Sequence, residues 1–592
     1  MIQDLIKVQI ANALFALYEI NIAKEKVVIE ATTADFEGDF TFVVFPYLKQ
    51  SRKNPEQTAK EIGDYLQKNF SELATFEVVK GFLNLGIKET FWLNFLLDQA
   101  NTKNFGFAPK NTKEPILVEY SSPNTNKPLH LGHVRNNLLG FAVSEILKAN
   151  GHQVFTCNLV NDRGIHICKS MYAWMKFGNG ETPETSGLKG DHLVGKYYVI
   201  FDQQYKKEIE ELRLKGLSEE DAAKNAPSIL SAQEMLVKWE ANDDEIVGVW
   251  KMMNDWVYEG FEVTYNKLGV QFDQYYYESN TYLLGKEIVK EGLDKEVFFT
   301  KENGSVWIDL TPEGLDQKLV LRGDGTSVYI TQDLGTAEMK YEQFHCNRSI
   351  YVVGNEQEYH FKVLQQIALK LNKTYAAGIY HLSYGMVELP QGKMKSREGT
   401  VVDADELIAE MENTAAETTK ALGKMEGESE ENLNALYHTI GMGALKYYLL
   451  KVDPKKKMMF NPEESIDFQG NTGPFIQYTH ARIRSILRNA GDVSTHFAIE
   501  NISLSKVEKE LLQKIYQFPL VIKEAGKDLS PGVVCNYVYE LAKIYSLFYH
   551  DHTILKEENL DQKNLRLNMC KMTAEIIRSA FGLLGIAVPE KM

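Results

Sequence analysis

Two histidines three residues apart, His130 and His133, are the side chains of this 592-residue chain best placed for chemistry. Gly132 stands between them in the tetrad HLGH and leaves room for a ligand to approach the backbone. Neutral or cationic imidazoles beside a phosphate can stabilise the charge that builds up as phosphorus becomes five-coordinate, and no nucleophile is needed. The tetrad therefore predicts a phosphate-binding site, although a turn that happens to contain two histidines would look the same.

The stretch around the tetrad predicts a strand, a loop and a helix. Residues 116–120 are mostly apolar and β-prone, residues 121–128 are rich in Ser, Asn and Pro, and apolar residues recur at helical spacing from Leu139 to Leu147. In an open parallel sheet, nucleotides bind at the carboxyl ends of the strands, where the N-terminus of the next helix offers free N–H groups to phosphate. The tetrad is expected at that point.

The sequence around the tetrad gives a more specific indication. HLGH resembles the HIGH signature of class I aminoacyl-tRNA synthetases, and SPNTNKPLHLGHVRNNLLG, residues 122–140, resembles the arginyl-tRNA synthetases within that class. The resemblance covers residues 80–592 with specific motifs and the first 80 weakly. It implies that ATP and L-arginine form arginyl-adenylate, that the arginyl group passes to the 2′-hydroxyl of the terminal adenosine of tRNA(Arg), and that activation needs tRNA.

A second signature lies downstream, where KMKSR spans Lys393–Arg397. It resembles the KMSKS loop that closes over ATP in class I synthetases, but Ser396 stands where the second lysine is usual. Lys395 from a shifted backbone, or Lys127 ahead of the tetrad, would supply that charge. We favour Lys127, because arginyl enzymes without the second lysine carry a lysine there. The resemblance thus assigns catalysis to His130, His133, Lys127, Lys393 and Lys395, and ATP binding to His130, Gly132, His133, Lys393 and Lys395.

Polar residues at the ends of apolar runs predict a pocket for the amino acid. Glu278 and Asp333 would pair with a guanidinium, whose planar donors suit two carboxylates. Tyr329 and Gln357 would orient it, and the resemblance supports all four positions. Ser122 and Asn124 would reach the α-amino or carboxylate end, completing the predicted substrate set Ser122, Asn124, Glu278, Tyr329, Asp333 and Gln357. The alternative is that the two acids are helix caps or surface residues.

The spacing of the cysteines and of the candidate histidine and acidic ligands predicts that the protein itself holds no metal ion. The five cysteines lie far apart without zinc-type spacing and are expected to be buried free thiols. Asp191 and His192 are adjacent but have no third ligand at a helpful spacing, so a solvated turn is expected there. Mg²⁺ is expected to accompany ATP without a dedicated cage.

Composition places the chain among globular proteins. It is 44% hydrophobic and 25% charged, and its formal net charge of −16 argues against indiscriminate nucleic-acid binding. The N-terminal stretch has charges within its apolar periodicity and is expected to be an amphipathic helix rather than a signal peptide. No run approaches the roughly 18 apolar residues of a membrane span. A cytoplasmic monomer is expected.

The expected fold is multidomain α/β. Residues 1–108 would form an N-terminal α/β module that contacts tRNA. Residues 109–402 would form a Rossmann-like catalytic domain with a parallel sheet and insertions at about 166–250 and 279–326, its second half including strands at Ser327–Ile330, Ile350–Val353 and Ile379–Leu389. Residues 403–592 would form an all-α stem and anticodon-binding bundle.

The helical tail offers residues for tRNA binding. His480, Arg484 and Arg488 recur at i, i+4 and i+8, which makes a one-sided basic surface that could follow a phosphate backbone or simply face solvent. Aromatic residues crowd 534–555, where one or two, such as Tyr545 and Tyr549, could stack on anticodon bases while others form the core. The resemblance extends to Met592, which is expected to approach the anticodon.

Three rival functions fit parts of this pattern. Another HxGH nucleotidyl transferase would lack the long helical tail, and a class I ligase for a different amino acid would lack the paired acids. An RNA-binding relative without chemistry would not need His130, His133 and Lys393 intact.

Overall fold

A computed structural model of the chain describes residues 2–33, 36–388, 402–421 and 429–592. Its packing divides into two units. One comprises the segments up to Lys103, Asn489–Tyr516 and Ile544–Thr573, and the other comprises Asn104–Arg488, Gln517–Lys543 and Ala574–Met592.

The N-terminal part of the first unit is an antiparallel sheet with helices beside it. Its strand order is β1-β2-β4-β3, formed by Ile29–Ala31, Phe40–Val43, Phe82–Ile87 and Leu73–Val79. The amphipathic helix expected at the N-terminus is α1 (Ile2–Tyr18), and a second helix, α3, spans Pro55–Asn69. Helix α3 begins where it does because the Asn54 side chain accepts a hydrogen bond from Gln57 N, and Pro55 needs no partner for its nitrogen.

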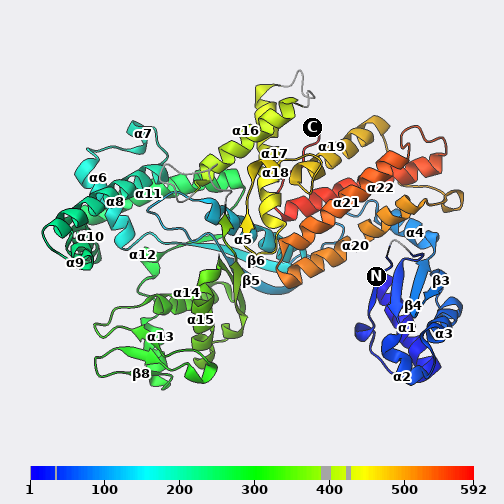
Figure 1. Ribbon diagram of the computed structural model, residues 1–592, viewed down its shortest axis with the longest axis horizontal. Helices are drawn as coiled ribbons and strands as arrows, with labels where there is room; N and C mark the ends of the chain where they lie inside the picture. Colours follow the sequence, from blue (N-terminus) through cyan, green and yellow to red (C-terminus); the bar gives the residue numbers. More distant parts are fainter. Residues whose placement is uncertain (1, 34–35, 389–401, 422–428) are drawn as a thin grey trace. The chain divides into compact units, whose positions relative to one another are not determined.

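The second unit contains a five-stranded parallel sheet of order β12-β11-β5-β6-β7 (Figure 1). The strands are Ile379–Tyr384, Arg348–Gly354, Lys113–Glu119, His152–Val160 and Gln274–Tyr277. Helix α5 (Leu131–Ala149) connects β5 to β6, and α15 (Glu358–Lys370) connects β11 to β12. The strand order reverses between β5 and β11, which is where sheets of this kind bind ligands. The expected Rossmann-like domain is therefore confirmed.

One expected strand of this sheet is wrong. Residues Ser327–Ile330 lead into helix α14 (Tyr329–Phe344) rather than forming a strand. The β-prone residues are overridden because Ile330, Leu334 and Ala337 share a buried helical face. In addition, the Thr331 hydroxyl accepts a hydrogen bond from Val328 N and closes the first turn.

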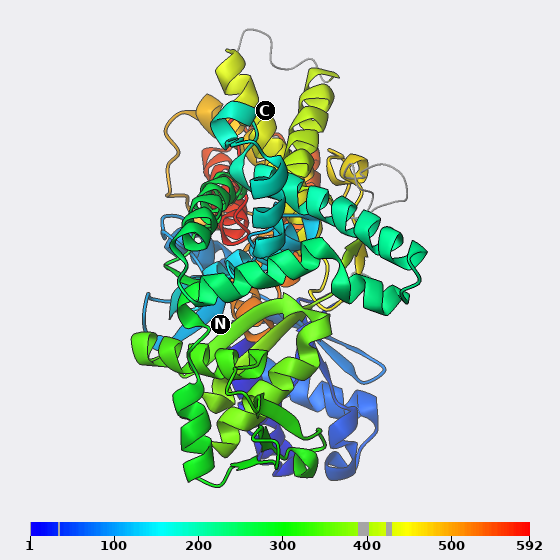
Figure 2. The same cartoon turned by 90° about the vertical axis from the view of Figure 1, so that its left-hand side faces the viewer.

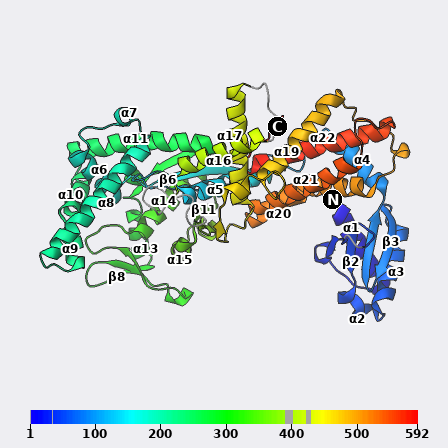
Figure 3. The same ribbon diagram turned by 45° about the horizontal axis from the view of Figure 1, so that its top comes forward.

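Two insertions interrupt the sheet. Between β6 and β7 lie the helices α6 (Ile165–Phe177), α8 (Gly190–Leu214), α10 (Pro227–Glu240) and α11 (Asp244–Leu268), which Figure 2 and Figure 3 show bundled together. The last helix extends beyond the expected limit of this insertion because its apolar face continues to Leu268, which is buried. A small antiparallel sheet, β10-β9-β8, follows β7 and uses Lys318–Leu321, Val306–Ile308 and Phe298–Thr300.

The C-terminal part is helical, as expected. Its long helices are α16 (Ala404–Ala421), α17 (Glu430–Leu450), α19 (Gly473–Ala490), α20 (Lys506–Asp528), α21 (Pro531–Asp551) and α22 (Leu560–Leu583). Among the described residues, no helix is both long and apolar enough to cross a membrane. All five cysteines are free and buried, as predicted, and burial raises the pKa of each thiol.

Candidate active site

The loop after β5 is held in an unusual conformation. Ser121 and Ser122 have φ values of 75° and 45°, in the left-handed region that non-glycine residues rarely adopt. Asn136 Oδ1 accepts from Ser121 N at 2.6 Å, and Asn158 Oδ1 accepts from Ser122 N at 3.0 Å. These two buried asparagines compensate the backbone strain, as is common where a loop must hold functional groups in place.

Asn136 also joins the strands on either side of the strand-order reversal. Its Nδ2 donates to Val352 O at 2.7 Å, near the end of β11, and to the Tyr384 hydroxyl at 3.2 Å, at the end of β12. Its Oδ1 holds the end of β5 through Ser121. One side chain of α5 therefore fixes the carboxyl ends of three strands where a ligand would bind.

The two histidines stand side by side at the N-terminus of α5. His130 Nδ1 accepts from Gly132 N at 3.1 Å, and His133 Nδ1 accepts from His130 N at 3.2 Å. Their ring centroids lie 3.9 Å apart. Because each Nδ1 accepts a hydrogen bond, the proton of a neutral ring must be on Nε2, which can then donate to a ligand.

Burial keeps both rings neutral near pH 7. Desolvation, with a smaller contribution from the Lys127 charge, lowers the pKa of His130 to about 4. Desolvation also lowers the pKa of His133 far below its ordinary value, assisted by His130 and Lys127. Burial lowers the pKa of Lys127 as well. His130, His133 and Lys127 thus form a cradle that offers two neutral Nε2–H donors and a partly buried lysine.

The chain following the second signature returns to the tetrad. Leu131 N donates to Val402 O and Ala404 N donates to Leu129 O, both at 2.9 Å. These bonds place residues 402–404 against the backbone on both sides of His130. The predicted lysines Lys393 and Lys395 lie outside the described residues.

Glu278 and Asp333, the two acids of the predicted guanidinium site, lie close enough for the Asp333 charge to act on Glu278. Glu278 begins the short helix α12 (Glu278–Thr281) directly after β7, and Asp333 lies in the second turn of α14. Burial raises the pKa of Glu278 to about 7. Arg163 opposes this shift, and the carboxylates of Asp162 and Asp333 add to it. Asp333 Oδ2 lies 2.5 Å from His360 Nε2.

Asp162 is a residue of this site that the sequence reasoning missed. Its buried carboxylate accepts from Ser279 N at 2.8 Å, from Ser279 Oγ at 2.7 Å and from the Tyr258 hydroxyl at 2.9 Å. It therefore fixes the turn that carries Glu278. The signal that identified Glu278, a polar residue just after an apolar strand, applies equally to Asp162.

The other predicted pocket residues are more exposed. Tyr329 is 78% exposed at the start of α14, Gln357 lies exposed in the 3₁₀ turn Asn355–Gln357 after β11, and Asn124 is also exposed. Ser122 is half-buried, and its carbonyl accepts from Asn161 Nδ2 at 3.1 Å. The structure thus brings the two acids together and leaves the orienting residues at the solvent edge.

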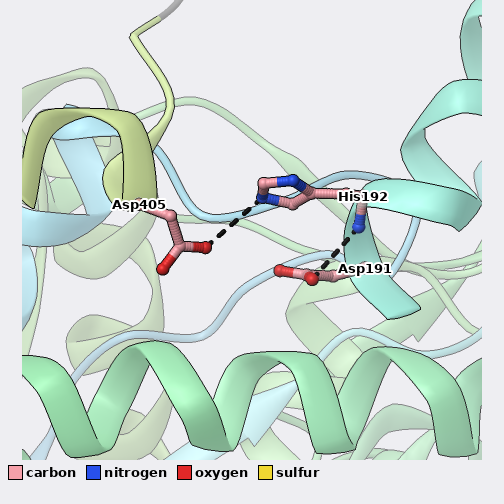
Figure 4. A group of neighbouring side chains, drawn as sticks. All are labelled: Asp191, His192 and Asp405. Atoms are coloured by element: carbon pink, nitrogen blue, oxygen red, sulfur yellow. Dashed lines mark hydrogen bonds and ion pairs between the residues drawn. The ribbon is translucent and has the colours of Figure 1, made fainter. Parts of the chain in front are cut away.

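One group of side chains in the described part of the chain could hold a metal ion, formed by Asp191, His192 and Asp405 (Figure 4). The expected solvated turn is wrong, since Asp191 is fully buried in the first turn of α8. The third group comes from α16, far away in the sequence. However, Lys189 Nζ forms an ion pair with Asp405 and lies 3.2 Å from Asp191 Oδ2. A cation therefore already neutralises these carboxylates.

The basic face of α19 contacts the chain's own C-terminal residues. His480 Nδ1 lies 3.0 Å from Pro589 O, Arg484 Nε donates to Glu590 Oε2 at 2.7 Å, and Arg488 donates to Glu590 O at 2.9 Å. The expected open basic surface is thus shared with residues 589–590, which carry an acidic side chain.

The two tyrosines expected to stack on bases differ in exposure. Tyr545 is fully buried, so the expectation that it stacks on a base is wrong; its hydroxyl lies 3.4 Å from Cys570 Sγ in the core. Tyr549, one helical turn further, is 42% exposed, and Met592 is half-buried.

Comparison with known proteins gives matches along the whole chain. The family model described as tRNA synthetases class I (R), catalytic domain, matches residues 96–461. The DALR anticodon binding domain matches residues 476–592, and the arginyl tRNA synthetase N terminal domain matches residues 2–87. The arginine–tRNA ligase of Bacteroides thetaiotaomicron is 55% identical over 595 residues, and that of Flavobacterium psychrophilum 54% identical over 604 residues, each alignment covering 100% of both chains.

Solved structures match in fold. The arginyl-tRNA synthetase of Thermus thermophilus gives a TM-score of 0.80 at 23% identity, covering 100% of both chains. That of Plasmodium falciparum gives 0.77 at 20% identity, covering 100% of this chain and 99% of the other.

Proposed function

This chain belongs to the class I arginyl-tRNA synthetases, and we propose that its arginine–tRNA ligase activity uses the described cradle for ATP and the paired carboxylates for arginine. The tetrad follows the carboxyl end of β5 and Glu278 follows that of β7, and parallel strands end at the same edge of their sheet, which supports placing the two sites together. Two observations support the assignment: the charge of Asp333 acts on the buried Glu278 carboxyl, and the tetrad holds a pair of neutral imidazoles.

In the first step, the arginine carboxylate attacks the α-phosphorus of ATP and pyrophosphate leaves. His130 and His133 donate from Nε2 to the phosphate oxygens, where negative charge grows as phosphorus becomes five-coordinate. Their low pKa values suit this role, because a neutral donor neither takes up nor releases a proton during the step. Each Nδ1 is held by the backbone, so both rings are already oriented.

Lys127 supplies positive charge in this proposal. It is partly buried in the loop before the tetrad, close enough for its charge to lower the pKa of both histidines. An ammonium at this position would neutralise negative charge on the ATP phosphates. Lys393 and Lys395 remain proposed ATP ligands from that segment.

Arginine is proposed to bind with its guanidinium between Glu278 and Asp333. Each carboxylate can accept charge-assisted hydrogen bonds from the planar cation, an arrangement that an ammonium cannot fill equally well. Tyr329 and Gln357 would close over the bound side chain from the solvent edge. Ser122 and Asn124 would contact the α-amino or carboxylate end, near the α-phosphorus.

The enzyme uses ATP, and Mg²⁺ is proposed to arrive with it, held by phosphate oxygens and water. The groups around the tetrad are imidazoles and an ammonium. The nearby Asp403 carboxylate already caps α16 by accepting from Asp405 N at 2.8 Å and Glu406 N at 3.1 Å. The described residues therefore suit a metal bound to nucleotide rather than a protein cage.

The tRNA(Arg) partner is bound through the anticodon-binding domain. Arg484, Arg488, Tyr549 and Met592 are its proposed contacts there; Tyr545 is not, since its ring is buried. We further propose the division into a tRNA-contacting module at 1–108, a catalytic domain at 109–402 and a helical tail at 403–592. A monomer acting in the cytoplasm completes the proposal.

Arginine-dependent exchange of pyrophosphate into ATP tests this function. Arginine should be the amino acid that supports the exchange, and the exchange should depend on added tRNA. Exchange supported equally by lysine, or without any amino acid, would contradict the assignment. Charging of tRNA with labelled arginine measures the second step separately.

A further inference from the structure

We propose that Lys189, His192 and Asp405 form an ion-pair network that positions His130 for ATP, and that these three are positioning residues of adenylate formation. The inference rests on the proposed role of His130. The proposal gives a function to the cluster formed by Asp191, His192 and Asp405, where the sequence predicted only a solvated turn (Figure 4).

The network joins three helices of the second unit. Lys189 is the residue directly before α8, and its Nζ donates to Thr264 Oγ1 of α11 at 2.6 Å. The same ammonium pairs with Asp405 in the first turn of α16. Lys267 Nζ of α11 lies 3.6 Å from Asp405 Oδ1, and the Lys267 side chain is 46% exposed. The helical insertion thus holds the start of α16.

His192 adds a second cation to the network. Its Nε2 lies 3.3 Å from both Asp403 Oδ2 and Asp405 Oδ2. Burial opposes its charge, but hydrogen bonds with Asp403 and Asp405 and the charge of Asp191 raise its pKa to about 10. The imidazolium is therefore charged at neutral pH.

The charges of the network balance. Its carboxylates are Asp191, Asp403 and Asp405, and its cations are Lys189, His192 and Lys267. A divalent ion would have to displace an ammonium that already bonds to its neighbours. The packing is also tight, because a Cβ at Gly260 would come within 2.4 Å of Asp191 Oδ1. These facts favour an ion-pair network over a metal site.

The network acts on His130 through the backbone. Asp403 and Asp405 flank Ala404, whose N–H donates a hydrogen bond to Leu129 O. In addition, Val402 O accepts a hydrogen bond from Leu131 N. The network therefore holds residues 402–405, and this segment is hydrogen-bonded to the residues on both sides of His130. Since displacement of a reacting group by about 1 Å can cost about 10²-fold in rate, loosening this segment should impair ATP chemistry.

The test compares charge-removing variants with a matched control on the same helix. Asp405→Asn and Lys189→Met remove the central pair, and Lys196→Met removes an ion pair of α8 with Glu181, at 2.7 Å, that does not touch residues 402–405. Pyrophosphate exchange with full-length enzyme and tRNA gives kcat and separate KM values for ATP and arginine. Calorimetry measures arginine binding without ATP, and thermal unfolding checks the fold.

We expect the two central variants to lower kcat/KM for ATP by about tenfold or more. Arginine binding without ATP should stay near the wild-type value. Lys189→Arg should restore most of the activity because it retains the charge, and Lys196→Met should match wild type. If Asp405→Asn unfolds, Lys267→Met provides a milder change and should reduce kcat/KM for ATP by about twofold to threefold.

Three results would overturn the inference. The first is central variants that behave like Lys196→Met. The second is an equal loss for ATP and arginine, which would indicate general damage rather than positioning. The third is a stoichiometric divalent ion in purified wild-type enzyme that is lost in Asp405→Asn. Absence of arginine-dependent exchange in wild type would instead contradict the proposed function itself.

Discussion

Arginine binding should depend on pH through Glu278. Its carboxyl has a pKa of about 7 in the free protein, because it is buried beside other carboxylates. A bound guanidinium would favour the ionised form and lower that pKa. The complex then holds fewer protons than the free protein, so affinity must rise with pH and level off above pH 7.

The size of the effect follows from the fraction of Glu278 that is ionised. With a pKa of about 7, this fraction is about one-tenth at pH 6 and about nine-tenths at pH 8. The Kd for arginine should therefore fall about tenfold over this interval, which corresponds to about 1.4 kcal/mol. About half a proton should be released per arginine bound at pH 7.

Calorimetric titration at pH 6, 7 and 8 in buffers of different ionisation enthalpy measures both quantities. Glu278→Gln keeps the shape of the side chain and removes the titrating group, so its Kd should be weaker and independent of pH. Asp333→Asn is the matched control, because it should weaken binding and retain a pH dependence, with its midpoint somewhat lower since one neighbouring negative charge is removed. A Kd that stays constant in wild type, or a slope that persists in Glu278→Gln, would refute this reasoning.

Three further perturbations test other parts of the second unit. His133→Ala should slow adenylate formation by about 10²-fold, as for one lost transition-state donor; His133→Asn can still accept from His130 N and so separates helix capping from chemistry. Wild-type exchange rates in both would exclude His133 from catalysis. Asp333→Ala should raise the arginine KM by about tenfold or more with little change for ATP, and equal rises would place the pocket elsewhere. Glu119→Gln should lower the free energy of unfolding by about 3 kcal/mol or more, because it strands the buried Lys340 ammonium. Urea unfolding measures this loss. If Glu119→Gln unfolds like wild type, the ion pair between Glu119 and Lys340 does not stabilise the fold by this amount.

Local pattern predicts much of this fold. The apolar runs at 116–120 and 154–160 correspond to β5 and β6, and the residues of the tetrad are neighbours in the sequence, so their contacts are short-range. Ser327–Ile330 shows the limit of such reasoning. Three β-prone residues, Val328, Tyr329 and Ile330, predicted a strand. The helical spacing of Ile330, Leu334 and Ala337 predicted a helix, and only burial against neighbouring elements could decide between the two.

Long-range contacts lay beyond the sequence reasoning. The spacing of Asp191 and His192 gave no hint of Asp405, because α16 reaches them only through the fold. Tyr545 and Tyr549 lie on one helix, and which of them faces the core depends on the neighbours of α21. Asp162 differs, since it follows an apolar strand in the sequence and so carries the same local signal as Glu278.

The burial of every native cysteine makes selective labelling of this enzyme straightforward. Protonated, inaccessible thiols react slowly with maleimides, so the five native cysteines need not be replaced first. A cysteine introduced at Leu214, which is 80% exposed at the end of α8, should take a fluorophore cleanly. A second at Glu431, exposed at the start of α17, would complete a dye pair that reports the separation of the two helices in solution.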